Sequence, residues 1–289
     1  MIKRTLLASA AAAMLATAAG SALAQKDARI ERGRYLMDSV VACGNCHIAR
    51  GEKGAPLFDK GLSGGMVFDI PGIKAFASNI TPDPETGIGK WTEAQIIKAI
   101  REGVRPDGTI IGPPMPVEFY RDMSDADVAA IAAYLKAQPA VKNAVAKSEY
   151  KIPLPPSYGP AVKGVKTPSQ KNTVQYGKYL AQIGHCMECH TPRDQKGQLV
   201  KAQWGAGGQV FPGPWGESVS RNLTPHETGL KNWTDAEIAK VIREGVGKDG
   251  SPRKPPMAFG WYKNINDADM KALIAYLRSM KPVAFAGKS

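Results

Sequence analysis

The chain has 289 residues, of which 43% are hydrophobic and 22% are charged, a globular composition that excludes a collagen-like, disordered or polytopic membrane protein. Its four cysteines are too few for a disulfide scaffold in a chain of this length. The formal net charge of +12 favours acidic partners or anionic lipid surfaces, whereas no basic run or aromatic-basic platform indicates nucleic-acid binding.

Residues 1–24 have the pattern of a secretory signal peptide. Lys3 and Arg4 form a basic start, Leu6–Ala19 is an uncharged run, and Ala22–Ala24 supplies the small residues of a cleavage site. A retained membrane anchor is the alternative, but the run is short for a span and rich in alanine. We therefore expect cleavage, export to the periplasm and a formal charge of +10 on the mature chain.

The rest of the chain contains an internal duplication. Trp91–Met115 aligns with Trp233–Met257 without a gap, and 15 of the 25 positions are identical. Equivalent positions stay 142 to 144 residues apart over the whole of the two copies. The sequence therefore predicts two similar domains, 25–150 and 174–289, joined by a proline-rich linker over 151–173.

Apolar residues at helical spacing and N-capping side chains predict that each copy is mainly helical, so the expected fold class is all-α. The predicted helices cover Glu31–Val41 and Gln175–Ile183, start at the capping boxes of Thr92 and Thr234, and start after Ser124 and Asn266. Gly103 and Gly245 are expected to end the second helix of each copy. Strand signals are weak and are confined to Met66–Ile70 and Gln209–Phe211.

All four cysteines lie in a Cys-x-x-Cys-His motif, one motif in each copy. This is the pattern of c-type haem attachment, in which two thiols bind the haem vinyl groups and the histidine is the proximal iron ligand. A thioredoxin-like motif would need a βαβ setting that is missing here, and a zinc site would need the four cysteines to meet. The sequence predicts two covalently bound haem c groups, held by Cys43, Cys46, His47, Cys186, Cys189 and His190.

The duplication also predicts the second axial ligand. Of the ten methionines, Met115 and Met257 align with each other, each in Pro-Pro-Met, 68 and 67 residues after the proximal histidine. Methionine raises the reduction potential of a haem, which suits electron transfer. The alternative is that both methionines fill the core. His185 and His226 have no histidine opposite them in the first copy and are expected at the surface.

Other aligned residues are candidates for contacts with the haem propionates: Trp91, Trp233, Asn79 and Asn222. A plain core position is an equally good interpretation of the two tryptophans. Arg50 and Arg193 also recur near the motifs and are further candidates for propionate contacts, although the solvated surface is the expected position of both. Gly33 and Gly177 predict that the first helix of each copy crosses close to the third.

These residues together resemble the multihaem class I cytochromes c that serve periplasmic dehydrogenases. The resemblance covers both copies, and its most specific segments are Asn79–Asp83, Gly87–Thr92 and each Pro-Pro-Met. The chain is similar to the cytochrome subunits of membrane-bound alcohol, gluconate and fructose dehydrogenases and of some molybdenum hydroxylases. The resemblance implies class I domains, His/Met ligation by the residues named above, and no substrate chemistry of the chain's own. It also implies electron transfer from a periplasmic dehydrogenase to a cytochrome, a quinone or an oxidase.

The alcohol and sugar dehydrogenase subunits typically carry three haem domains and a C-terminal membrane-associating segment. The two domains found here favour a soluble shuttle or a smaller subunit, peripheral on the inner membrane at most. The alternative function is a dihaem enzyme, such as a cytochrome c peroxidase or a thiosulfate-oxidising cytochrome, with one reactive haem. The two distal loops are nearly copies, which favours electron transfer. They differ at Gly112 against Lys254 and at Pro116 against Ala258, differences expected to separate the two potentials.

Overall fold

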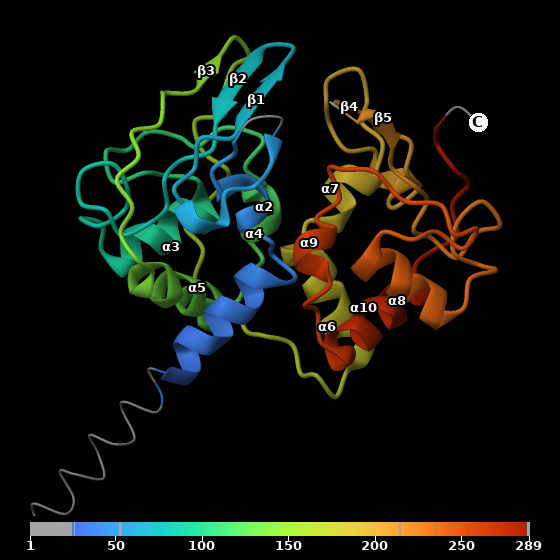
Figure 1. The fold of residues 1–289 in the computed structure, drawn as a ribbon. Helices are drawn as coiled ribbons and strands as arrows, with labels where there is room; N and C mark the ends of the chain where they lie inside the picture. Colours follow the sequence, from blue (N-terminus) through green and yellow to red (C-terminus); the bar gives the residue numbers. More distant parts are fainter. Residues whose placement is uncertain (1–24, 26, 52–53, 214, 288–289) are drawn as a thin grey trace, which may run out of the picture.

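The computed structural model describes the chain except for residues 1–24, 26, 52–53, 214 and 288–289. The predicted signal peptide therefore lies outside the described residues. Figure 1 shows the two copies side by side, each with its helices below and a small sheet at the same end of the molecule. Within the part of the chain that is described, every helix is too short or too polar to cross a membrane.

The two copies repeat the same order of helices. In the first copy these are a helix over 27–38, α2 (Gly44–His47), the 3-10 turn η2 (Phe58–Lys60), α3 (Glu93–Glu102), α4 (Val117–Tyr120) and α5 (Asp125–Ala137). In the second copy they are α6 (Thr173–Ile183), α7 (Cys186–His190), η3 (Lys201–Gln203), α8 (Asp235–Glu244), α9 (Phe259–Tyr262) and α10 (Asp267–Ser279). The first helix ends at residue 38 rather than at Val41. At this end the Ser39 Oγ donates to the carbonyl of Tyr35, at 2.5 Å, and the Val41 N–H donates to that of Leu36, five residues back, at 2.9 Å.

The predicted starts of the second and third helices of each copy, and the predicted end of the second, are confirmed. The side chains expected to cap the helices each accept a hydrogen bond from the main-chain N–H three residues ahead: Thr92, Ser124, Thr234 and Asn266. The two threonines form full capping boxes, each stabilising its helix by about 1 kcal/mol. Gly103 and Gly245 end their helices in the left-handed region, with φ of 65° and 68°.

Two small antiparallel sheets add to the helices. The strands are β1 (Val67–Ile70), β2 (Ile73–Phe76) and β3 (Glu149–Tyr150) in the first copy, and β4 (Val210–Gly213) and β5 (Gly216–Val219) in the second. Val67 pairs with Phe76, and Val210 pairs with Val219. The structure therefore combines the predicted helices with short strands, so the all-α expectation is met only in part. The possible strand segments at Met66–Ile70 and Gln209–Phe211 overlap β1 and β4, whereas β2, β3 and β5 had no sequence signal.

The first and third helices of each copy cross at a glycine, as predicted. A Cβ on Gly33 would lie 2.0 Å from the main-chain oxygen of Ala130, and one on Gly177 would lie 1.8 Å from that of Ala272. No side chain fits at either crossing.

The two copies meet through reciprocal hydrogen bonds. Tyr35 of the first copy donates to Asp269 of α10 at 2.8 Å, and the equivalent Tyr179 donates to Asp127 of α5 at 2.6 Å. The two aspartates are 2% and 3% exposed. Arg32 also donates to Asp127, at 2.8 and 3.1 Å. The interface therefore has approximate twofold symmetry, since equivalent residues of the two copies make the same contact.

Residues 150–167, which we call the strap, pack across the first copy. Beyond Tyr150 the strap has no regular helix or strand. Its contacts with the first copy include Tyr158 Oη to the Ile111 carbonyl at 2.9 Å, Val162 N to Glu102 at 2.9 Å and Gly164 N to Asp125 at 2.8 Å. These bonds hold the strap against the end of α3 and the start of α5.

Candidate haem-binding sites

The two Cys-x-x-Cys-His motifs form the short helices α2 and α7. The residue directly before each first cysteine is a non-glycine residue in the left-handed region: Ala42 with φ of 51° and His185 with φ of 42°. Such a conformation costs on the order of 1 kcal/mol and is concentrated at functional sites. The turn is the same in both copies and starts the motif helix immediately after the preceding longer helix. All four cysteines are free and half-buried.

The two motif histidines make the same hydrogen bond. His47 Nδ1 lies 2.8 Å from the Ser78 carbonyl, and His190 Nδ1 lies 2.7 Å from the Arg221 carbonyl. A carbonyl accepts from Nδ1–H, which leaves the Nε2 lone pair free for a metal. Burial lowers the pKa of both imidazoles, while these hydrogen bonds partly oppose that shift. Both rings are therefore neutral near pH 7, the form that binds iron.

The motif thiols are in an environment that suppresses thiolate chemistry. Burial raises their pKa to about 12 for Cys43 and Cys189 and to about 11 for Cys46 and Cys186. A thioredoxin-like site lowers the pKa of its thiol instead, so the structure argues against that alternative. Nor do three or more His, Cys, Asp or Glu side chains cluster closely enough to hold a metal ion anywhere in the described ranges, so the zinc alternative has no support.

The two Pro-Pro-Met loops have the same conformation. Met115 and Met257 are partly buried against the core, each on the loop that enters α4 or α9. The Met115 carbonyl accepts from the N–H two residues ahead at 2.9 Å, and that of Met257 does so at 3.0 Å. The preceding Pro-Pro peptide bond is cis in both copies. This matched geometry shows no altered distal side, and the dihaem-enzyme alternative is not favoured.

The structure argues against the expected propionate contacts of Asn79 and Asn222. Both side chains are buried, at 4% and 2% exposure. The amide N of Asn79 donates to Thr86 at 3.1 Å and to the Val141 carbonyl at 2.8 Å, while its oxygen accepts two bonds from Thr81. Asn222 makes the equivalent set. Both amides are therefore fully used inside the protein. They tie the chain that follows the third helix to the loop before the second.

The two tryptophans sit in equivalent places. Trp91 and Trp233 are partly buried against the core, and their carbonyls accept from Lys136 and Arg278 of the third helices. This packing agrees with the core interpretation. A propionate contact of either indole stays a prediction.

Arg50 is half-buried, so the expected position at the solvated surface is met only in part. Its Nη1 and Nη2 donate to the carbonyls of Gly54 and Asn45, and its buried Nε has no partner among the described residues. One buried, free N–H donor beside the first motif fits an acidic group of a bound cofactor. Arg193 is more open, with 39% of its side chain exposed. The sequence feature that pointed to a role for this arginine was its recurrence at the same place in both copies.

The two motifs lie near each other at the interface between the copies. A Cβ on Gly44 would lie 2.6 Å from the indole nitrogen of Trp261 in α9. Tyr120 of α4 lies edge-on to His185, with ring centroids 6.0 Å apart, so His185 belongs to this interface and not to the free surface. The two candidate haem sites are therefore neighbours.

Sequence reasoning missed one aligned pair at this interface. Tyr120 and Tyr262 are 4% and 9% exposed, and the pKa of each is raised well above its ordinary value, mainly by burial. Their recurrence five residues after each predicted methionine ligand was a usable signal.

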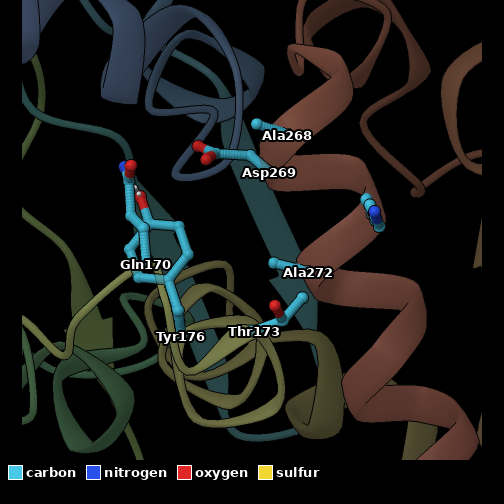
Figure 2. A pocket seen from close by; sticks show the side chains of 7 residues that line it. Gln170, Thr173, Tyr176, Ala268, Asp269 and Ala272 are labelled. Carbon is cyan, nitrogen blue, oxygen red and sulfur yellow. Dashed lines mark hydrogen bonds between the residues drawn. The ribbon is translucent and has the colours of Figure 1, made fainter.

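A hollow of about 160 Å³ lies away from the motifs, between α6 and α10. Figure 2 shows Gln170 and Tyr176 on one side of it and Asp269 and Ala272 of α10 on the other. None of the predicted haem ligands lines it. The hollow gives water access to the edge of the reciprocal Tyr–Asp interface.

Comparison with known proteins matches each copy to a cytochrome family. Residues 28–135 match the family model described as cytochrome C oxidase, cbb3-type, subunit III, and residues 174–281 match the one described as cytochrome c. The chain is 30% identical to a diheme cytochrome c-type of Cereibacter sphaeroides, over 83% of this chain and 82% of that protein.

Larger relatives also match. The cytochrome c subunit of the alcohol dehydrogenase (quinone) of Gluconobacter oxydans is 31% identical, over 95% of this chain and 60% of the relative. One subunit of the nicotinate dehydrogenase of Pseudomonas putida is 30% identical, over 91% of this chain and 22% of the relative. The chain thus spans between a fifth and three fifths of the length of these two relatives.

The fold and the paired motifs define two tandem cytochrome c domains. The chain belongs to the dihaem c-type cytochromes and carries two covalently bound haem c groups.

Proposed function

We propose that this cytochrome carries electrons from a periplasmic dehydrogenase toward the respiratory chain and performs no substrate chemistry of its own. Each bound haem supplies a one-electron couple. The residues that hold the haems are Cys43 and Cys46 with Cys186 and Cys189 as the thioether pairs, His47 and His190 as proximal ligands, and Met115 and Met257 as distal ligands.

The observation that carries this proposal is the matched environment of the two motifs. In both copies a half-buried imidazole is fixed by a carbonyl on Nδ1 and presents Nε2. In both, the Pro-Pro-Met loop has the same conformation. Two equivalent sites with the same ligand loops suit electron transfer better than turnover at one open site. Their closeness at one interface also favours electron transfer between the haems, because electronic coupling falls off with distance.

The names of the relatives support a dehydrogenase as the electron donor. An alcohol dehydrogenase, a fructose dehydrogenase and a gluconate 2-dehydrogenase each have a cytochrome subunit that resembles this chain. We place the protein in the periplasm, because haem attachment to Cys-x-x-Cys-His accompanies export and the first 24 residues carry the pattern of a signal peptide. The acceptor in this proposal is a component of the respiratory chain.

An optical spectrum of the purified holoprotein, with haem quantified per chain, tests the site assignment. We expect two haems per chain and a near-infrared methionine-to-ferric-iron band at the intensity of two methionine-ligated haems. A high-spin component, or a band from one haem only, would contradict the assignment.

The dehydrogenase step is tested by adding the oxidised holoprotein to periplasmic extract of its host with alcohol, gluconate, fructose or nicotinate. Haem reduction with one substrate and not with boiled extract supports the proposal, and turnover of a small substrate by the cytochrome alone refutes it.

A further inference from the structure

The two haem-attachment motifs differ in charge at one position. Glu188 stands between the two cysteines of the second motif, where the first motif has Asn45. Each of these residues directly precedes the second cysteine of its motif and lies two positions before the histidine assigned to the iron. The chain therefore places a carboxylate beside the second haem site and a neutral amide beside the first.

Side chains around the second motif hold Glu188 in place. His185 Nδ1 lies 3.2 Å from its Oε2, and its main-chain carbonyl accepts from the Gln209 side chain at 2.6 Å. Arg193 Nη2 lies 3.8 Å from Oε1, which is long for a charge-assisted hydrogen bond, so this arginine neutralises the carboxylate only in part. The Glu188 side chain is 22% exposed, and water therefore screens its charge less than at the open surface.

The first motif carries no charge at this position. The Asn45 amide donates to the Pro256 carbonyl at 3.3 Å. Arg50, the equivalent of Arg193, donates to the main-chain carbonyls of Gly54 and Asn45. Because the arginine recurs in both copies, it does not distinguish the two sites, whereas the carboxylate does.

The second thiol of each motif reports the sign of this difference. Burial is the main cause of the raised pKa of both Cys46 and Cys189. At Cys46 the largest effect of a charged side chain is that of Arg50, which lowers the pKa. At Cys189 it is that of Glu188, which raises the pKa. The local field is therefore more negative at the second site than at the first.

Two cations of the second copy act in the opposite direction. Arg221 stands where the first copy has Ser78, and Lys254 stands where it has Gly112. Both cationic side chains are exposed, and the Lys254 ammonium donates to the Glu217 carbonyl at 3.4 Å. Water and salt screen charges at the open surface, so the half-buried carboxylate has the larger effect.

A nearby negative charge stabilises a ferric haem relative to a ferrous one, because the ferric iron carries one positive charge more. We propose that Glu188 sets the order of the two haems, in that its carboxylate lowers the reduction potential of the second haem below that of the first. In the half-reduced protein one electron then passes from the second haem to the first. The second iron is oxidised from ferrous to ferric, the first is reduced from ferric to ferrous, and no bond forms or breaks. This inference rests on the proposed electron-transfer function and adds the direction in which electrons cross the chain.

A spectroelectrochemical titration of the holoprotein tests the order. It is run at pH 8, where imidazoles are generally neutral, and in about 1 M salt, where a Debye length of about 3 Å weakens the exposed charges. Glu188→Gln removes the carboxylate, and Asn45→Asp places one in the first motif. Glu244→Gln makes the same change of net charge at an exposed residue at the end of α8 and is the matched control. Met257→His identifies the wave of the second haem, because histidine ligation lowers its potential.

We expect two waves in the wild type, of which Met257→His moves the lower one further down and leaves the upper one in place. Glu188→Gln should raise the lower wave alone and reduce the preference of the electron for the first haem about tenfold, which is about 59 mV for a one-electron couple. Asn45→Asp should lower the upper wave, and Glu244→Gln should move neither. Haem content and the methionine band show that the charge variants are intact.

The order would be overturned if Met257→His displaced the upper wave, or if Glu188→Gln left the lower wave unmoved or shifted both waves equally. A shift in Glu244→Gln as large as that in Glu188→Gln, or a single two-electron wave in the wild type, would overturn it too. The titration needs no dehydrogenase, so its outcome is separate from that of the extract assay. Two waves in the expected order, in a protein that no extract reduces, would support the order and refute the proposed electron donor.

Discussion

The reciprocal Tyr–Asp contacts predict an unequal response to two equivalent substitutions. Tyr35→Phe and Tyr179→Phe each remove the phenolic hydrogen bond to an aspartate of the other copy, at 2.8 and 2.6 Å. Each also removes the bonds of that hydroxyl to the residue that caps the third helix of the other copy, Asn266 or Ser124. By length alone the bond from Tyr179 to its aspartate is the stronger. The aspartates left behind are nevertheless in different situations, and this difference decides the cost.

Asp127 keeps two hydrogen bonds from Arg32 when Tyr179 loses its hydroxyl, whereas the carboxylate of Asp269 has Tyr35 as its one side-chain donor within the described ranges. A hydrogen bond to a charged group contributes about 1.5–3 kcal/mol, and a buried acceptor left without a donor pays its desolvation cost. The 160 Å³ hollow beside Asp269 has room for roughly five waters, which limits that cost. We expect Tyr35→Phe to lower the free energy of unfolding by about 2 kcal/mol and Tyr179→Phe by about 1 kcal/mol.

Urea unfolding of the holoprotein, followed by circular dichroism, measures both values. Tyr134→Phe is the matched control, because the Tyr134 hydroxyl makes no hydrogen bond to the other copy within the described part of the chain, and we expect a change below about 0.5 kcal/mol. An equal or larger loss for Tyr179→Phe would show that bond length, and not the partners left to the carboxylate, sets the strength of the interface. Such a result would refute the reasoning.

Three further predictions follow from single positions. Gly33→Ala places a Cβ 2.0 Å from a carbonyl of α5, so we expect a loss of about 3 kcal/mol or failure to fold, while Gly260→Ala, with open space around it, leaves thermal unfolding unchanged. Met257→His should remove half of the near-infrared methionine band and lower one of the two midpoint potentials in an optical redox titration, and a full band would contradict the ligand assignment. The hydrogen bond from Arg101 lowers the pKa of Asp125, so its carboxylate stabilises the fold above pH about 4 and loses that effect as the pH falls through the lowered value. Urea titrations should therefore show wild type and Asp125→Asn converging in acid, and a difference that persists there would argue against this.

Local features of the fold were predictable because local chemistry determines them. Thr92 with the amide side chain three residues later specifies a helix start, and Gly103 specifies a helix end, without help from the rest of the chain. Gly33 predicted its close crossing because no other residue leaves the space. The haem motifs were predictable for the same reason. The spacing of Cys43, Cys46 and the following histidine is what lets the two thiols bind the haem and the imidazole face the iron.

Contacts between the copies were not predictable from the duplication. Two copies of one sequence specify two similar folds, but not which surfaces meet. Tyr35 could equally well have packed within its own domain, and its aligned partner Tyr179 shows the same ambiguity. Asn79 illustrates another limit: its position near the haem motif favoured a cofactor contact, whereas its hydrogen-bond partners are on Val141, 62 residues away, and on Thr86. Such distant partners leave no periodic signal in the sequence.

Gly112 and Lys254 are aligned residues that differ, and the structure shows a steric consequence of this difference that the sequence did not. From the sequence, this difference predicts unequal potentials for two otherwise matched haems. The structure shows that glycine is also required at position 112 for steric reasons, because Tyr150 of the strap occupies the volume that any side chain would need. Lys254 stands where no strap passes within the described residues, so its side chain reaches solvent. A Gly112→Lys substitution must therefore displace the strap, whereas Lys254→Gly removes only a surface charge. The two copies thus keep one set of ligand loops and differ in what covers those loops within the described residues.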